Sequence, residues 1–91
     1  MNDQIFEGVV IDKTPTADFT DKSGRTHTEC YILVESQEMY PQRVAVQLTD
    51  DLEKHSPMVG HRVRCHLNYR ISTGTSGKWF NEIKAWRVES C

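Results

Sequence analysis

Aromatic rings and cations are interleaved in the segment SGKWFNEIKAWRVES, residues 76–90. It contains both tryptophans of the chain and one of its three phenylalanines, together with Lys78, Lys84 and Arg87. Flat rings stack on unpaired bases and cations contact phosphates, so this mixture is typical of a surface that binds single-stranded nucleic acid. A core strand with charges on its outer side would contain the same residue types. The two interpretations differ in which rings the strand exposes.

Alternation along this segment divides its side chains between two faces of a strand. We expect Ile83 and Ala85 to face the core. The opposite face then carries Phe80, Glu82, Lys84, Trp86 and Val88. Three environments stay open for Trp86: a stacking platform, the end or helix side of the core, and a dimer interface. Trp79 and Lys78 lie where a loop meets the strand, a position suited to base stacking and a phosphate contact.

Strand patterns dominate the rest of the chain. We expect strands at residues 5–13, 27–35, 43–48, 62–70 and 78–89, and loops rich in Gly, Ser and Thr at 14–25 and 71–77. A short helix should begin at Thr49 or Asp50, which would cap it, and should end before Pro57 and Gly60.

The sequence also predicts which side chains of these strands face the core. The run CYILV at 30–34 predicts burial on both faces over part of its length, and Gly8 predicts a bulge or bend in the first strand. Alternation places one set of side chains toward the core: Val44, Val46, Leu48, Val63, Cys65, Leu67 and Tyr69. The outer face of the fourth strand then carries Arg62, Arg64, His66, Asn68 and Arg70.

Three strands, a short helix and two further strands follow the order of the OB-fold, a five-stranded Greek-key barrel. A small β-sandwich or an SH3-like barrel is the alternative, but the helix between the third and fourth strands favours the OB-fold. A chain of 91 residues has room for one core. We therefore expect an all-β, five-stranded OB-fold barrel with one short helix, formed by residues 1–91 as a single domain.

An OB-fold binds ligands on its second and third strands, between the loop after the first strand and the loop before the fifth. Candidate contacts therefore lie in these loops, on these strands and on the neighbouring strands. The residues expected to bind nucleic acid are Lys22, Arg25, Tyr31, Arg43, Arg64, Arg70, Lys78, Trp79, Phe80, Lys84 and Trp86. Their convergence on one groove carries the prediction, because each cation alone would be an ordinary surface charge.

Charge is unevenly distributed along the chain. The formal net charge is −2, but residues 61–87 contain six cations and one anion, whereas residues 1–60 contain five cations and eleven anions. A basic C-terminal third could attract a polyanion to one face of the molecule, provided that folding keeps those charges together.

Catalytic and metal-binding patterns are absent from the sequence. Cys30, Cys65 and Cys91 are widely spaced, and the four histidines show no ligand spacing, so we expect neither disulfides nor a metal site. No nucleophile with a base, carboxylate pair or phosphate-binding glycine motif stands out. We expect a protein that is not an enzyme and needs no cofactor.

Three segments, YILVESQEMYPQRVAV, VGHRVRCHLNYRI and GKWFNEIKAWRVE, resemble a family of short bacterial single-domain proteins of unknown function that are similar to OB-fold single-stranded-DNA-binding proteins. The resemblance covers residues 6–89, with its most specific parts at 35–41 and 78–86. It implies the OB-fold and binding of single-stranded DNA. Members often carry a tryptophan early in the second strand, where this chain has Thr26 or His27. A lost stacking platform there would weaken binding.

Two functions compete. The first is binding of single-stranded DNA, or RNA, with little sequence preference. The second is an OB-like protein-interaction module that docks to a replication or recombination partner through anchors such as Tyr40 and Trp86. A small core predicts a homodimer. The absence of a signal-peptide pattern and of a long apolar run predicts a cytoplasmic protein without membrane association.

Overall fold

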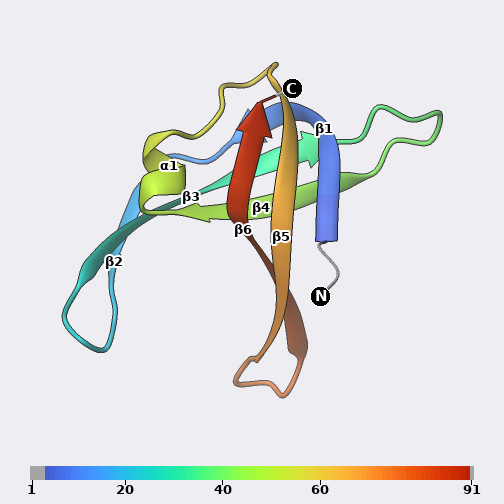
Figure 1. Cartoon of the computed structure of the whole chain (residues 1–91). Helices are drawn as coiled ribbons and strands as arrows, with labels where there is room; N and C mark the ends of the chain where they lie inside the picture. Colours follow the sequence, from blue (N-terminus) through green and yellow to red (C-terminus); the bar gives the residue numbers. More distant parts are fainter. Residues whose placement is uncertain (1–3, 91) are drawn as a thin grey trace.

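Six strands and one helical turn make up the computed structural model, which describes residues 4–90 (Figure 1). The elements are β1 (Gln4–Lys13), β2 (Ala17–Thr20), β3 (Thr26–Glu35), β4 (Arg43–Thr49), α1 (Asp51–Lys54), β5 (Arg62–Thr73) and β6 (Trp79–Ser90). Cys91 lies outside the described residues. Residues 4–90 contain no helix that is long and apolar enough to span a membrane.

Five of these strands close into a ring. The first half of β1 pairs with β5 and the second half pairs with β3, while β3 also pairs with β4 and β5 with β6. The ring closes through a parallel contact of β4 with β6 at Gln47 and Lys84. The expected all-β fold is therefore confirmed, and its helix lies between the third and fourth strands of the ring.

Gly8 lies where β1 changes partners. A Cβ atom at this position would overlap the carbonyl oxygen of Glu35, so β1 and the end of β3 approach too closely for any other residue. The irregularity of β1 lies next to this point rather than at Gly8, because its pairing with β3 shifts register between Val10 and Asp12.

The core fills the ring from all five strands. Its buried side chains are Val10, Cys30, Ile32, Val34, Val46, Leu48, Val63, Cys65, Leu67 and Ala85. The inward alternation expected for Val46, Leu48, Val63, Cys65 and Leu67 is confirmed. Burial of the run CYILV on both faces is wrong in part, because Tyr31 faces outward and is 41% exposed.

A β-bulge in β6 changes the alternation of the last strand. His66 pairs with Arg87 and Leu67 pairs with Ala85, so Trp86 has no partner on β5. Ala85 is buried as expected, but Val88 packs against the core instead of facing outward, because the extra residue reverses the alternation beyond it.

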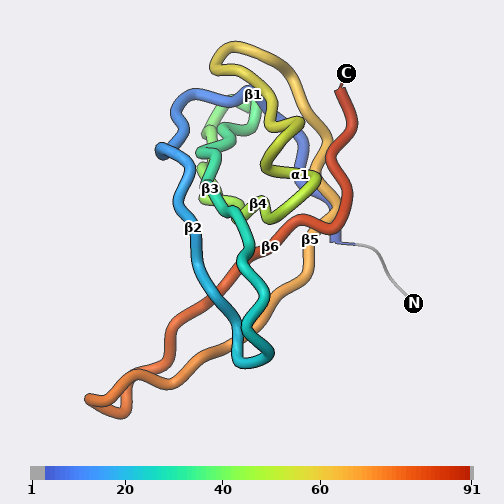
Figure 2. The backbone as a smooth tube through the Cα atoms, turned by 90° about the vertical axis from the view of Figure 1, so that its left-hand side faces the viewer, coloured from blue at the N-terminus to red at the C-terminus, as the bar shows by residue number. Residues whose placement is uncertain are grey.

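Two of the expected loops are shorter than predicted because strands extend into them. Residues 17–20 form β2, which pairs with β3, and β5 continues to Thr73 along β6. The resulting hairpins extend beyond the ring, and we name them the β2–β3 arm (residues 17–29) and the β5–β6 arm (residues 69–83). Both arms project from the same end of the ring (Figures 1 and 2). Tyr69, expected in the core, is exposed because it lies on the second arm.

The helix is a single turn, and Asp50 occupies its N-cap position with φ 52° and without a side-chain capping hydrogen bond. Its carboxylate contacts His27 instead. The expected N-cap position at Asp50 is confirmed, but its side chain bonds to His27 and not to the helix.

Candidate nucleic-acid interface

The outer face of β3 and β4 carries a groove that ends at β6. We name it the β3–β4 groove; it measures about 310 Å³ and is lined by Tyr31, Arg43, Val44, Ala45, Gln47, Asn81, Glu82 and Ile83. Cross-strand pairing places Tyr31 beside Gln47. This is the face that an OB-fold uses for its ligands, and it lies between the two arms.

Two polar groups of the β3–β4 groove are already bonded to carboxylates beside it. Arg43 Nε donates to Glu35 Oε2 at 2.8 Å, and Gln47 Nε2 donates to Glu29 Oε2 at 2.6 Å. Burial, followed by the negative charges of Glu29 and Glu82, raises the pKa of the Tyr31 hydroxyl. The groove therefore offers a neutral phenol ring and amide groups, and its cation is partly neutralised.

Tyr31 separates this groove from a smaller one of about 230 Å³, lined by Asp12, Lys13, Thr14, Tyr31, Ile32, Leu33 and Ala45. The backbone of Tyr31 is fixed by a hydrogen bond from its N–H to Thr14 Oγ1 at 2.9 Å. The phenol ring consequently stands between two shallow depressions on a rigid strand, a placement that suits stacking on a base.

Lys22 and Arg25 lie at the turn of the β2–β3 arm. Asp21 organises this turn, because its Oδ1 accepts hydrogen bonds from the backbone N–H groups of Ser23 and Arg25 and from the Ser23 hydroxyl. Those bonds and the one to His27 lower the pKa of Asp21. The two cations are thus presented on an ordered turn.

The β5–β6 arm presents Lys78, Trp79 and Phe80. Trp79 is 79% exposed, as expected for a ring without a packing role. The ring of Phe80 lies against Gly74, where a Cβ atom would come within 2.7 Å of it. Phe80 is therefore partly held by its own hairpin, whereas Trp79 is free to receive a ligand.

Three other candidates, Arg70, Lys84 and Trp86, line a different groove between the helix and the base of the β5–β6 arm. We name it the α1 groove; it measures about 580 Å³ and is formed by Thr49, Leu52, Asn68, Tyr69, Arg70, Lys84, Ala85 and Trp86. Tyr69, Asn68 and Thr49 were missed by sequence reasoning. Only the departure of β5 from the ring exposes Tyr69, and alternation carries no signal of that departure.

Arg64 does not reach any of these grooves. Its Nε donates to Glu7 Oε1 at 2.6 Å and its Nη1 lies 3.6 Å from Glu89, on the outer surface of β1, β5 and β6. Arg87 also contacts Glu89, at 3.0 Å. Folding therefore pairs part of the basic C-terminal third with carboxylates. The expectation that all candidates converge on one groove is wrong, because Arg70, Lys84 and Trp86 line the α1 groove and Arg64 lines none of the grooves.

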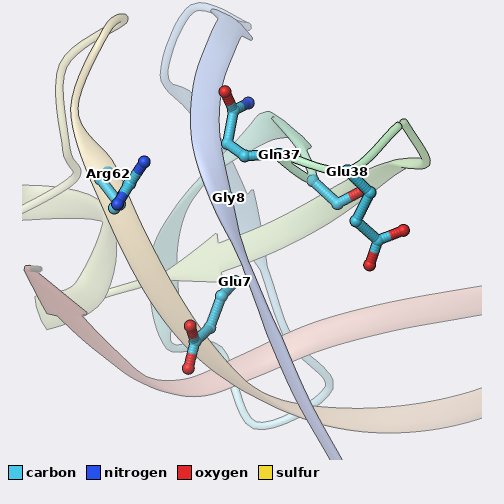
Figure 3. A pocket seen from close by; sticks show the side chains of 6 residues that line it. Glu7, Gly8, Gln37, Glu38 and Arg62 are labelled. Carbon is cyan, nitrogen blue, oxygen red and sulfur yellow. The ribbon is translucent and has the colours of Figure 1, made fainter. Parts of the chain in front are cut away.

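A further depression of about 320 Å³ lies between β1, the start of β5 and the turn after β3, where Glu7, Gly8, Ser36, Gln37, Glu38 and Arg62 line it. Figure 3 shows the side chains of Glu7 and Glu38 around it with that of Arg62. None of the predicted nucleic-acid contacts lines it, and its two carboxylates disfavour a polyanion.

The closed ring of five strands, its parallel β4–β6 contact and the position of its helix define an OB-fold domain. The second OB-fold domain of replication protein A from Methanococcus maripaludis, solved by NMR, is similar to this chain with a TM-score of 0.71 at 15% identity, over 98% of this chain and 83% of that one. The family model for the domain of unknown function DUF3127 matches residues 5–89, so this chain belongs to that family. No match was found among curated proteins.

Proposed function

We propose that this chain binds single-stranded nucleic acid, namely single-stranded DNA in preference to duplex DNA, with little preference for sequence. The observation that carries the proposal is the pair of arms beside the β3–β4 groove. Together they offer Tyr31 in the groove, Trp79 on one arm and Lys22 and Arg25 on the other. Rings on a rigid surface with cations around it are the recurring elements of sequence-tolerant single-strand binding. The fold similarity to an OB-fold domain of replication protein A supports a nucleic-acid ligand in general.

The charges of the groove and of the arms indicate which of them would contact bases and which would contact phosphates. Glu82 lines the β3–β4 groove, and the groove's cation, Arg43, is paired with Glu35, so the groove is suited to bases rather than to phosphates. Phosphate contacts would come from the arm cations Lys22, Arg25 and Lys78. The proposal includes no catalytic step and no cofactor.

The test is fluorescence anisotropy of a labelled oligo-dT at low salt, with competition by unlabelled duplex of the same length. Preferential binding of the single strand is the expected result, since only unpaired bases expose ring faces for stacking. Equal competition by duplex would indicate plain electrostatic adhesion, and it would refute the proposal.

A second candidate, a protein-interaction module, is favoured by one observation. Met39 and Tyr40, in the turn between β3 and β4, are 87% and 82% exposed and line none of the grooves. Adjacent exposed apolar side chains on a turn suit a protein partner. A double substitution, Met39→Ser with Tyr40→Ser, should leave oligo-dT binding unchanged if the turn serves a partner instead.

A further inference from the structure

The α1 groove combines rings and cations without a carboxylate in its lining. Arg70 and Lys84 supply the charges, Tyr69 and Trp86 supply the rings, and Thr49 and Asn68 supply hydrogen-bonding groups. Two carboxylates lie close to these cations: Asp50, which is bonded to His27, has its pKa lowered by His27 and to a lesser degree by Lys84, and Glu82 is the cross-strand partner of Arg70. In the β3–β4 groove, by contrast, Glu82 is part of the lining and the one lining cation, Arg43, is paired with Glu35.

Trp86 faces outward because it alternates with the buried Ala85, and the β-bulge leaves it without a partner on β5. Beyond the bulge the alternation is reversed, so Val88 packs against the core. Its ring is 48% exposed and is braced by His66, at a centroid distance of 5.0 Å and an interplanar angle of 56°. A bulge leaves its extra residue outside the regular ladder, and bulges are frequent next to functional sites.

The two grooves adjoin each other at the contact between β4 and β6. Glu82 and Ile83 line the β3–β4 groove, and the next residues along β6 line the α1 groove. Likewise, Gln47 lines the first and Thr49 the second. Two residues along a strand span about 7 Å, a distance that one nucleotide of an extended single strand can cover.

We propose that the α1 groove is a second nucleotide subsite, in which a base stacks on Trp86 and the adjoining phosphates contact Lys84 and Arg70. The inference rests on the proposed function: the same single strand that lies over Tyr31 continues past the Gln47–Lys84 contact into the α1 groove. The ligand class is a single-stranded phosphodiester, since the groove pairs ring faces with cations.

The test uses the chain with Trp79→Phe, in which Trp86 is the remaining tryptophan of the two. Oligo-dT of about 20 nucleotides is the probe, because one OB-fold covers roughly 4–16 nucleotides. Binding is followed by anisotropy of the label, while Trp86 emission and its quenching by acrylamide are recorded in the same titration. We expect the bound strand to quench Trp86 emission and to protect it from acrylamide.

Variants provide the second readout. Trp86→Ala should lower affinity about tenfold with an unchanged salt dependence, and Lys84→Ala should lower it while reducing the salt slope by about one. Arg62→Ala is the matched control, because Arg62 is an exposed cation of β5 that lines neither groove and should leave affinity unchanged. Circular dichroism verifies that each variant folds.

The outcomes separate the inference from the function on which it rests. Two results together would overturn the subsite and leave the proposed function intact. Oligo-dT would bind tightly without altering Trp86 emission, and Lys84→Ala would bind oligo-dT with the same affinity and salt slope as Arg62→Ala. Absence of any anisotropy change would overturn both.

Discussion

Nε2 of His27 lies 2.7 Å from Oδ2 of Asp21, and its other ring nitrogen lies 3.0 Å from a carboxylate oxygen of Asp50. A neutral imidazole has one N–H, so only the protonated ring can donate to both carboxylates. Phe19 stacks on the same ring at 5.1 Å. His27 thus ties the turn of the β2–β3 arm to the corner between β4 and α1. It occupies one of the positions considered for the family tryptophan, and its ring is engaged within the protein.

The first prediction concerns pH. Hydrogen bonds to Asp21 and Asp50 raise the pKa of His27, so its stabilising contribution is complete below about pH 6.5 and is lost as the pH rises through the folded-state pKa. The pKa values of Asp21 and Asp50 are lowered, so their contribution persists until the pH falls below about 3.8. We expect His27→Gln to lower the thermal unfolding midpoint more at about pH 5.5 than at about pH 9.

His55→Gln is the control for this prediction, because His55 is an exposed histidine beyond the helical turn. It should change the midpoint little at either pH. If His27→Gln lowered the midpoint equally at both pH values, then packing on Phe19 would hold the arm, and the ion pairs of His27 with Asp21 and Asp50 would not.

The second prediction is that Gly8→Ala destabilises the ring. The new methyl group would overlap the Glu35 carbonyl and force β1 away from β3, at a cost of about 1–3 kcal/mol in the free energy of unfolding. Gly74→Ala is the comparison, since its methyl group would meet only the edge of the Phe80 side chain on an exposed arm. Urea denaturation measures both; equal costs would show that the close approach at Gly8 is not what requires glycine.

Sequence periodicity predicted the ring because core strands repeat every two residues, as Val46 with Leu48 and Val63 with Cys65 show. It could not predict β2, whose four residues are all exposed and therefore carry no apolar alternation. Nor could periodicity predict that Val88 faces the core. The bulge before it depends on how β6 pairs with β5, and the sequence of β6 alone does not indicate that pairing.

The candidate site was predicted by residue type better than by location. Trp79 was placed correctly because a loop-edge indole has nothing to pack against. Arg64 was misplaced because its position depends on long-range pairing with Glu7, which is 57 residues away in the sequence. Arg70, Lys84 and Trp86 come together in a groove that depends on the path of β5 beyond the ring.

The third prediction separates stacking from packing. Trp79→Ala should leave the free energy of unfolding nearly unchanged, because the ring is 79% exposed, and should weaken oligo-dT binding by about 1–3 kcal/mol. Leu67→Ala should cost about 2–5 kcal/mol of stability, since Leu67 is buried in the core. Denaturation and anisotropy are measured on both variants. Unfolding of Trp79→Ala with normal binding by the folded fraction would assign the ring to the core.

The fourth prediction is association into a homodimer. Met58 and Val59, in the segment between α1 and β5, are 67% and 55% exposed and line none of the grooves. Covering these side chains with a second copy would bury apolar area that one small ring leaves in water. Sedimentation equilibrium at tens of micromolar should report a dimer, and Val59→Lys should dissociate it. A monomer under these conditions would contradict the prediction.

The last prediction distinguishes arm cations from paired cations. Lys22 and Lys78 lie on the two arms, so each should contact phosphate and release roughly one counterion on binding. Lys22→Ala and Lys78→Ala should therefore each reduce the slope of log affinity against log salt by about one, whatever the sequence of the single strand. Arg64→Ala removes the same charge from the surface of β1, β5 and β6, where Glu7 and Glu89 already hold it, and should leave the slope unchanged. Anisotropy titrations across a salt series measure all three slopes. Should Arg64→Ala flatten the slope as much as Lys78→Ala does, the strand must pass over the outer surface of β1, β5 and β6 around Arg64, because Arg64 lines none of the grooves.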